Sequence, residues 1–135
     1  MTLKNLENLA RINQLKKEPF NKGEFDGLIK SAKARLKDAD LTSLSIESRF
    51  DLTYNSAHSI ALAALRKKGF RANNRFIVFQ ALADTMNVGP EIWRVLSKCH
   101  DCRNLAEYEG YMEVSGQLLQ ELLLATHKLL KLIDK

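Results

Sequence analysis

Apolar residues recur at spacings of three and four along most of the chain, which is the period of an amphipathic α-helix. No stretch alternates apolar and polar residues over the length of a strand. The pattern predicts helices over about residues 3–16, 21–38, 46–67, 74–86, 90–110 and 115–133. We therefore predict an all-α fold: an antiparallel up-and-down bundle of five or six helices, without a sheet.

Polar residues at the predicted helix starts support these boundaries. Asn21 is followed by Glu24 three residues later, which is the spacing of a capping box. Ser43 or Ser45 is expected to cap the third helix, and Ser115 the last one. The predicted helices thus begin where side-chain oxygens can accept hydrogen bonds from the first backbone amides.

The apolar positions of these helices predict the core. It should include the following ten residues: Phe25, Ile29, Phe50, Ala57, Ile60, Ala61, Ile92, Leu96, Leu122 and Leu129. The last helix carries more apolar residues than one stripe needs. The surplus is explained either by a deep groove that receives the helix or by a contact between subunits.

Length and composition indicate one domain with an ordinary balance of residues. The chain has 135 residues, 45% of them hydrophobic, and a net charge of +5. That charge is compatible with RNA, but the basic residues are scattered, which favours a solvated surface. The two cysteines favour a reducing compartment, and no apolar run reaches the ~20 residues of a membrane span. We predict a cytoplasmic protein without membrane association.

One short motif points to a class of function. The segment from Arg103 through Asn104 to Tyr108 lies near the end of the predicted fifth helix, and the third helix carries Tyr54 and His58 on one face. An Arg and a polar residue, then three or four residues and a His, form the signature of HEPN domains, which this chain resembles. Tyr108 stands where that family has its His. The resemblance covers most of the chain, with residues 21–135 as the HEPN-like core and 1–20 as an N-terminal helical extension.

The resemblance implies a site for phosphate chemistry between two subunits. In active family members the Arg holds phosphate, and the His helps to activate the ribose 2′-hydroxyl without a metal. Arg103 suits the first role, whereas the phenol of Tyr108, with a reference pKa near ~10, is a poor base. His58 could replace the missing base if the fold brings it near Arg103. The candidate residues are therefore Arg103, Tyr108 and His58 for catalysis, and Arg103, Asn104 and Tyr54 for nucleotide or phosphate binding.

Structural explanations compete with these roles. Arg103 could simply pair with a nearby acid at an exposed helix end, and His58 could be a packed core residue. Cys99 and Cys102 flank His100 and Asp101, but a zinc site needs further ligands at defined spacing, so we expect core thiols. His100 has no acidic or hydroxyl partner at motif spacing. We predict no metal and no cofactor.

A helix-turn-helix is the rival motif. Residues 82–96 contain a small residue, a turn and an apolar second helix, but that helix is one residue out of register. It begins with Pro90 and Glu91, which suit neither base edges nor phosphate. Trp93 is better explained as a core anchor. DNA binding is therefore the weaker alternative.

The function favoured by the sequence is a HEPN-like homodimer that binds a nucleotide or a partner and cleaves RNA weakly or not at all. The resemblance implies a small nucleotidyltransferase as protein partner, in a toxin–antitoxin-like pair, with RNA as a further candidate ligand. The first alternative is an active, metal-independent endoribonuclease. The second alternative is the helix-turn-helix DNA-binding protein.

Overall fold

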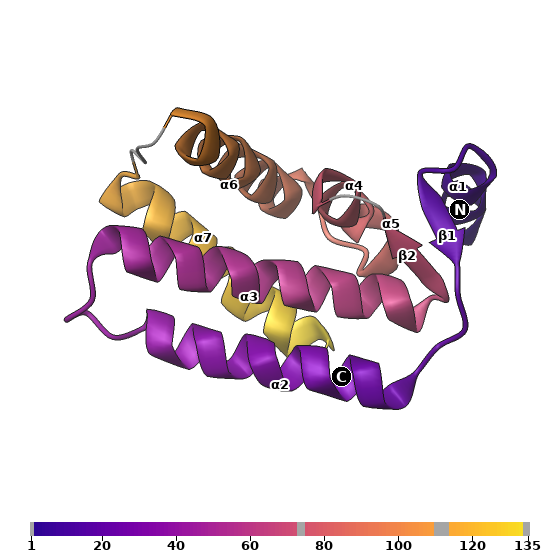
Figure 1. Cartoon of the computed structure of the whole chain (residues 1–135), viewed down its shortest axis with the longest axis horizontal. Helices are drawn as coiled ribbons and strands as arrows, with labels where there is room; N and C mark the ends of the chain where they lie inside the picture. The colour runs from indigo at the N-terminus through magenta and orange to yellow at the C-terminus, as the bar shows by residue number, and fades with distance from the viewer. Residues whose placement is uncertain (1, 73–74, 110–113, 134–135) are drawn as a thin grey trace.

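Helices dominate the computed structural model of the chain (Figure 1), which describes residues 2–72, 75–109 and 114–133, with side chains at 5–72, 77–105 and 114–133. The helices are α1 (Thr2–Arg11), α2 (Lys22–Ala39), α3 (Ile46–Lys67), α4 (Arg75–Gln80), α5 (Leu82–Thr85), α6 (Pro90–Glu109) and α7 (Gly116–Ile133). The predicted all-α class is therefore confirmed. No helix in these ranges combines the length and apolar character that a membrane crossing requires.

α3 is the central helix of the fold. It forms an antiparallel pair with α2 along most of its length, and α7 packs against the same two helices from behind in Figure 1. α4 and α6 cover another side of α3, and α6 also contacts α7. Ala57, Ala61 and Ala64 on α3 are buried, and these small side chains let the neighbouring helices approach closely. The bundle is thus built around one small-residue helix.

Nine of the ten predicted core residues are buried. Phe25 is the exception, because it lies half-buried in the first turn of α2, outside the buried stripe that begins at Ile29. Its ring instead contacts Phe20 and the ammonium group of Lys67 at the edge of the fold. On α7, the surplus residues Leu119 and Leu123 are buried, Leu130 and Ile133 pack partly buried against the core, and Leu124 is 70% exposed. The groove therefore accounts for most of the apolar surplus of α7.

The predicted caps are present. Asn21 Oδ1 accepts a hydrogen bond from the backbone amide of Glu24 at 2.9 Å, and Ser115 Oγ accepts from Leu118 N at 3.0 Å. Of the two candidates for α3, Ser45 is the cap, accepting from Ser48 N at 3.1 Å. Such caps satisfy amides that the helix itself leaves without partners.

The prediction of a fold without a sheet is wrong at one place. β1 (Leu15–Lys17) and β2 (Phe70–Ala72) pair antiparallel, with Leu15 opposite Ala72 and Lys17 opposite Phe70. The first helix accordingly ends at Arg11 and not at Lys16, because Asn13 adopts a left-handed conformation with φ 65°. Strands of three residues are too short to show an alternating pattern.

The sequence predicts a single helix over residues 74–86, but the structure has two helices in this region. α4 ends at Gln80, Ala81 forms a turn, and α5 covers the single turn Leu82–Thr85. The fourth helix is expected to start at Asn73 or Asn74, and the fifth to end at Gly110. These positions lie outside the described residues. The break before Pro90 is present, with Asn87 at φ 55°.

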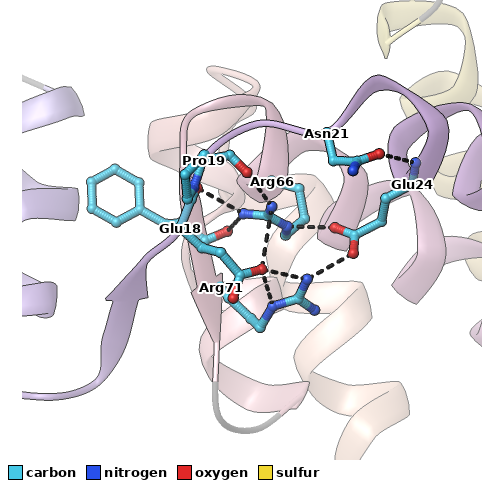
Figure 2. Close-up of polar contacts among 7 residues, drawn as sticks. Glu18, Pro19, Asn21, Glu24, Arg66 and Arg71 are labelled. Atoms are coloured by element: carbon cyan, nitrogen blue, oxygen red, sulfur yellow. Dashed lines mark hydrogen bonds and ion pairs between the residues drawn. The ribbon is translucent and has the colours of Figure 1, made fainter.

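A cluster of two arginines and two glutamates fastens the N-terminal segment to the bundle (Figure 2). Arg66 is 2% exposed and donates hydrogen bonds to Glu24 Oε1 at 2.5 Å and to the backbone carbonyls of Pro19, Glu18 and Phe70 at 2.7, 3.1 and 3.2 Å. Arg71 donates to Glu18 and Glu24, each at 2.7 Å. We call Glu18, Glu24, Arg66 and Arg71 the arginine cluster.

The arginine cluster is electrically balanced. Hydrogen bonding from Arg71 lowers the pKa of Glu18, and hydrogen bonding from Arg66 and then Arg71 lowers the pKa of Glu24. Because its carboxylate faces the arginines, the Glu24 side chain is diverted from the capping box that the sequence suggested. The cluster therefore acts as a structural clamp, since every charge in it has a partner.

Candidate functional site

The candidate site lies where α6 faces α3. Arg103 on α6 places its guanidinium carbon 5.7 Å from the centre of the Tyr54 ring on α3, within the range of a cation–π contact. Tyr54 is fully buried, and Asn104 follows Arg103 on the exposed side. The three residues predicted to bind phosphate or nucleotide thus lie on two facing helices.

His100 connects these residues. The Tyr54 hydroxyl lies 3.0 Å from His100 Nδ1, and Asn104 Nδ2 lies 3.1 Å from His100 Nε2. An amide nitrogen can only donate, so with this amide orientation Nε2 is the acceptor. In the other contact, His100 Nδ1 and the Tyr54 hydroxyl can each serve as donor or acceptor. We call Tyr54, His100, Arg103 and Asn104 the α3–α6 site.

His100 is the site residue that the sequence interpretation missed. No acid or hydroxyl stands at motif spacing from it in the sequence, but its hydroxyl partner, Tyr54, lies 46 residues earlier. One signal was available. His100 precedes Arg103 by three residues and Asn104 by four, so all three share one face of a helix.

Arg103 has an acidic partner. Its Nη1 forms an ion pair with Asp51 Oδ1 on α3, and the two side chains are 23% and 49% exposed. This confirms the alternative that Arg103 pairs with a nearby acid. Ion pairs with this much solvent exposure contribute little to stability, so an anionic ligand can compete with Asp51 for the guanidinium.

His58 packs against an aromatic ring. Its ring centre lies 5.9 Å from that of Phe79 in an edge-on arrangement, and the His100 ring lies 6.5 Å from the same phenylalanine. Tyr54 contacts Phe79 as well, at 5.6 Å. Phe79 therefore forms an apolar floor shared by both histidines and Tyr54. This surrounding favours the packed role for His58 that the sequence left open.

The other predicted residues fall outside this network. The backbone of α6 continues through Tyr108 to Glu109, but the Tyr108 side chain is outside the described residues. Cys99 is buried and Cys102 packs against the core, as expected of core thiols. Burial raises the pKa of Cys99 to about 12, and the neighbouring Cys102 thiol makes a smaller contribution in the same direction. The Cys99 thiol is therefore inert near neutral pH. Within the described side chains, no three His, Cys, Asp or Glu residues are grouped to hold a metal ion.

The helix-turn-helix gains no support from the geometry. The helix before its turn, α5, has only four residues, and the helix after it begins at Pro90 as the sequence suggested. Trp93 is half-buried.

Comparisons of the chain with family models, with curated proteins and with solved structures give no match.

Proposed function

We propose that this chain is a HEPN-like protein that binds a phosphate-bearing ligand, a nucleotide or RNA, at the α3–α6 site, and that it cleaves RNA weakly or not at all. The supporting observation is that Arg103 lies beside a hydrogen-bonded chain of Tyr54, His100 and Asn104. The guanidinium offers forked donors to phosphate. The Asn104 amide is exposed and can contact the rest of a nucleotide.

Weak cleavage follows from the state of the groups around Arg103. A general base needs an accessible lone pair near neutral pH. The phenol of Tyr108 has too high a reference pKa, near ~10, and the lone pair on His100 Nε2 already accepts from Asn104. The carboxylate of Asp51 also partly neutralises the positive charge of Arg103. The site is thus better suited to holding an anion than to removing a proton.

Binding of adenosine 5′-monophosphate tests this function. Arg103→Gln should weaken it by about 10- to 150-fold, because a hydrogen bond to a charged group is worth roughly 1.5–3 kcal/mol. Asp51→Asn should strengthen it, since the competing carboxylate is removed. Isothermal titration calorimetry measures both effects.

Arg94→Gln is the matched control, because Arg94 is an exposed arginine on the same helix. It should change the affinity by less than twofold. Equal losses of affinity in Arg94→Gln and Arg103→Gln would show that nucleotide binding depends only on the net charge of the protein.

We also propose a homodimer, as the resemblance implies, with a small nucleotidyltransferase as the partner protein. Leu124 on α7 is 70% exposed and supplies an apolar contact point. Sedimentation equilibrium at micromolar concentration should give twice the 15.4 kDa chain mass, and Leu124→Glu should shift it toward one chain. A wild-type monomer at high concentration would rule out a site shared between two subunits.

The second candidate function is an active, metal-independent endoribonuclease. The observation that favours it is the imidazole of His100 on the same helical face as Arg103. If Asn104 turned away on substrate binding, His100 Nε2 could accept a proton from a ribose hydroxyl. This candidate differs from the first in predicting that the unaltered chain cleaves RNA.

A further inference from the structure

A cavity whose chemistry differs from that of the α3–α6 site lies between the end of α1 and strand β1. Its volume is about 630 Å³, within the range of small-molecule sites. Figure 1 places α1 and β1 at one end of the molecule, beside β2 and α5, whereas α6 extends toward the other end. The charged residues that line the cavity are Arg11, Lys16, Lys17 and Glu7.

The three cations of this cavity are available to a ligand. Within the described side chains, no carboxylate lies at ion-pair distance from Arg11, Lys16 or Lys17, and all three are exposed. Leu15, the first residue of the same strand, is 3% exposed and anchors β1 against the fold. The lysines are therefore held on a fixed strand, in contrast to Arg66 and Arg71, whose charges are balanced by glutamates.

The local turn explains how the charges converge. Asn13, with φ 65°, ends α1 and reverses the chain, so that Arg11 in the last helical turn and the two lysines of β1 line the same space. Lysines on a short edge strand also discourage pairing with other chains. That role explains Lys16 and Lys17, but it does not require Arg11 on α1 to line the same cavity.

We infer that the α1–β1 cavity binds adjacent phosphate groups, carried either by a single nucleic-acid strand or by a free polyphosphate. Three cations against one carboxylate favour a ligand with at least two negative charges. The guanidinium matches phosphate oxygens in forked geometry, and the ammonium groups add point charges. The described lining offers no aromatic ring for stacking bases, so recognition is through phosphate and not through sequence.

Binding of two probes, tripolyphosphate and a single-stranded uridine 12-mer, tests this inference. In the double variant Lys16→Gln/Lys17→Gln, affinity for both probes should fall at least tenfold. For the RNA, the slope of log affinity against log salt should shrink by about 1.4, since each phosphate contact on a single strand contributes roughly 0.7. The control is Lys30→Gln/Lys37→Gln, which removes the same charge from exposed positions on α2 and should cost less than twofold.

The outcomes separate the sources of phosphate and can overturn the site. Loss for both probes supports a site that accepts adjacent phosphates from either source. Loss confined to the 12-mer identifies a nucleic-acid strand, and loss confined to tripolyphosphate identifies a free polyphosphate. Failure of both probes to bind at 100 mM salt, equal losses in the control variant, or equal binding of a tetraglutamate peptide would overturn it. The inference does not depend on the α3–α6 site, because the charges that carry it are those of Arg11, Lys16 and Lys17.

Discussion

Replacing Arg66 with alanine should lower the free energy of unfolding by about 3–5 kcal/mol, the cost typical of breaking a buried ion pair from one side. The side chain is 2% exposed, and it donates to three backbone carbonyls as well as to Glu24. Its removal leaves the carbonyls of Glu18, Pro19 and Phe70 without that donor. Urea denaturation followed by circular dichroism measures the change.

Arg71→Ala is the comparison for this prediction. Arg66 forms ion pairs with Glu18 and Glu24, and Arg71 pairs with the same two carboxylates. The Arg71 side chain is 37% exposed, so its loss should cost clearly less. The loss in free energy of unfolding for Arg66→Lys should be close to that for Arg66→Ala, because an ammonium group cannot reproduce the forked contacts. Equal losses for Arg66→Ala and Arg71→Ala would mean that the carbonyl contacts contribute nothing.

The effect of Arg66→Ala should also depend on pH. The pKa values of Glu18 and Glu24 in the folded chain lie below the ordinary value of 4.5. Their contribution to stability is therefore fully present above that value and is lost as the pH falls through the lowered folded pKa values. The difference between Arg66→Ala and the unaltered chain should narrow in acid, because only the carbonyl contacts then distinguish them.

Tyr108→His should increase cleavage of RNA by the chain in the absence of added metal. The substitution supplies an imidazole where the HEPN signature has one, and general base catalysis is typically worth on the order of 10²–10⁴-fold. The gain depends on Arg103 holding the phosphate. Cleavage of a fluorescent RNA at neutral pH, with and without a chelator, measures it.

Two further variants interpret that experiment. Arg103→Ala in the Tyr108→His background should abolish the gain. If the unaltered chain already cleaves RNA and His100→Gln removes that activity, the chain is a ribonuclease with His100 as its base. The proposal that it cleaves RNA weakly or not at all is then wrong. Persistence of cleavage in Arg103→Ala would exclude the α3–α6 site as the source.

Local signals in the sequence predicted most of the fold. The caps at Asn21, Ser45 and Ser115 and the buried stripe of α3 depend on residues within one or two turns of one another, and periodicity reports such relations directly. The strands could not be predicted in this way. Their pairing depends on Leu15 meeting Ala72 across 57 residues of sequence, and neither strand is long enough to show a period.

The candidate site was predicted in part for the same reason. Arg103 and Asn104 stand together in a motif, and Tyr54 was identified by its place on the central helix. His100 and Asp51 were not, because their roles arise only when α6 lies against α3. Nor did periodicity indicate that Arg66, in the basic last turn of α3, would be buried: its partners are carbonyls and carboxylates of other segments.

The attachment of the N-terminal segment has a consequence for the order in which the protein forms. On the ribosome, residues 5–20 emerge before Arg66 and strand β2, to which they attach and which are made about fifty residues later. A ten-residue helix such as α1 is marginal by itself in water. The hairpin of α2 and α3 needs only neighbouring residues and can form as it emerges. The N-terminal segment is therefore synthesised before the α2–α3 hairpin and acquires its native contacts after it.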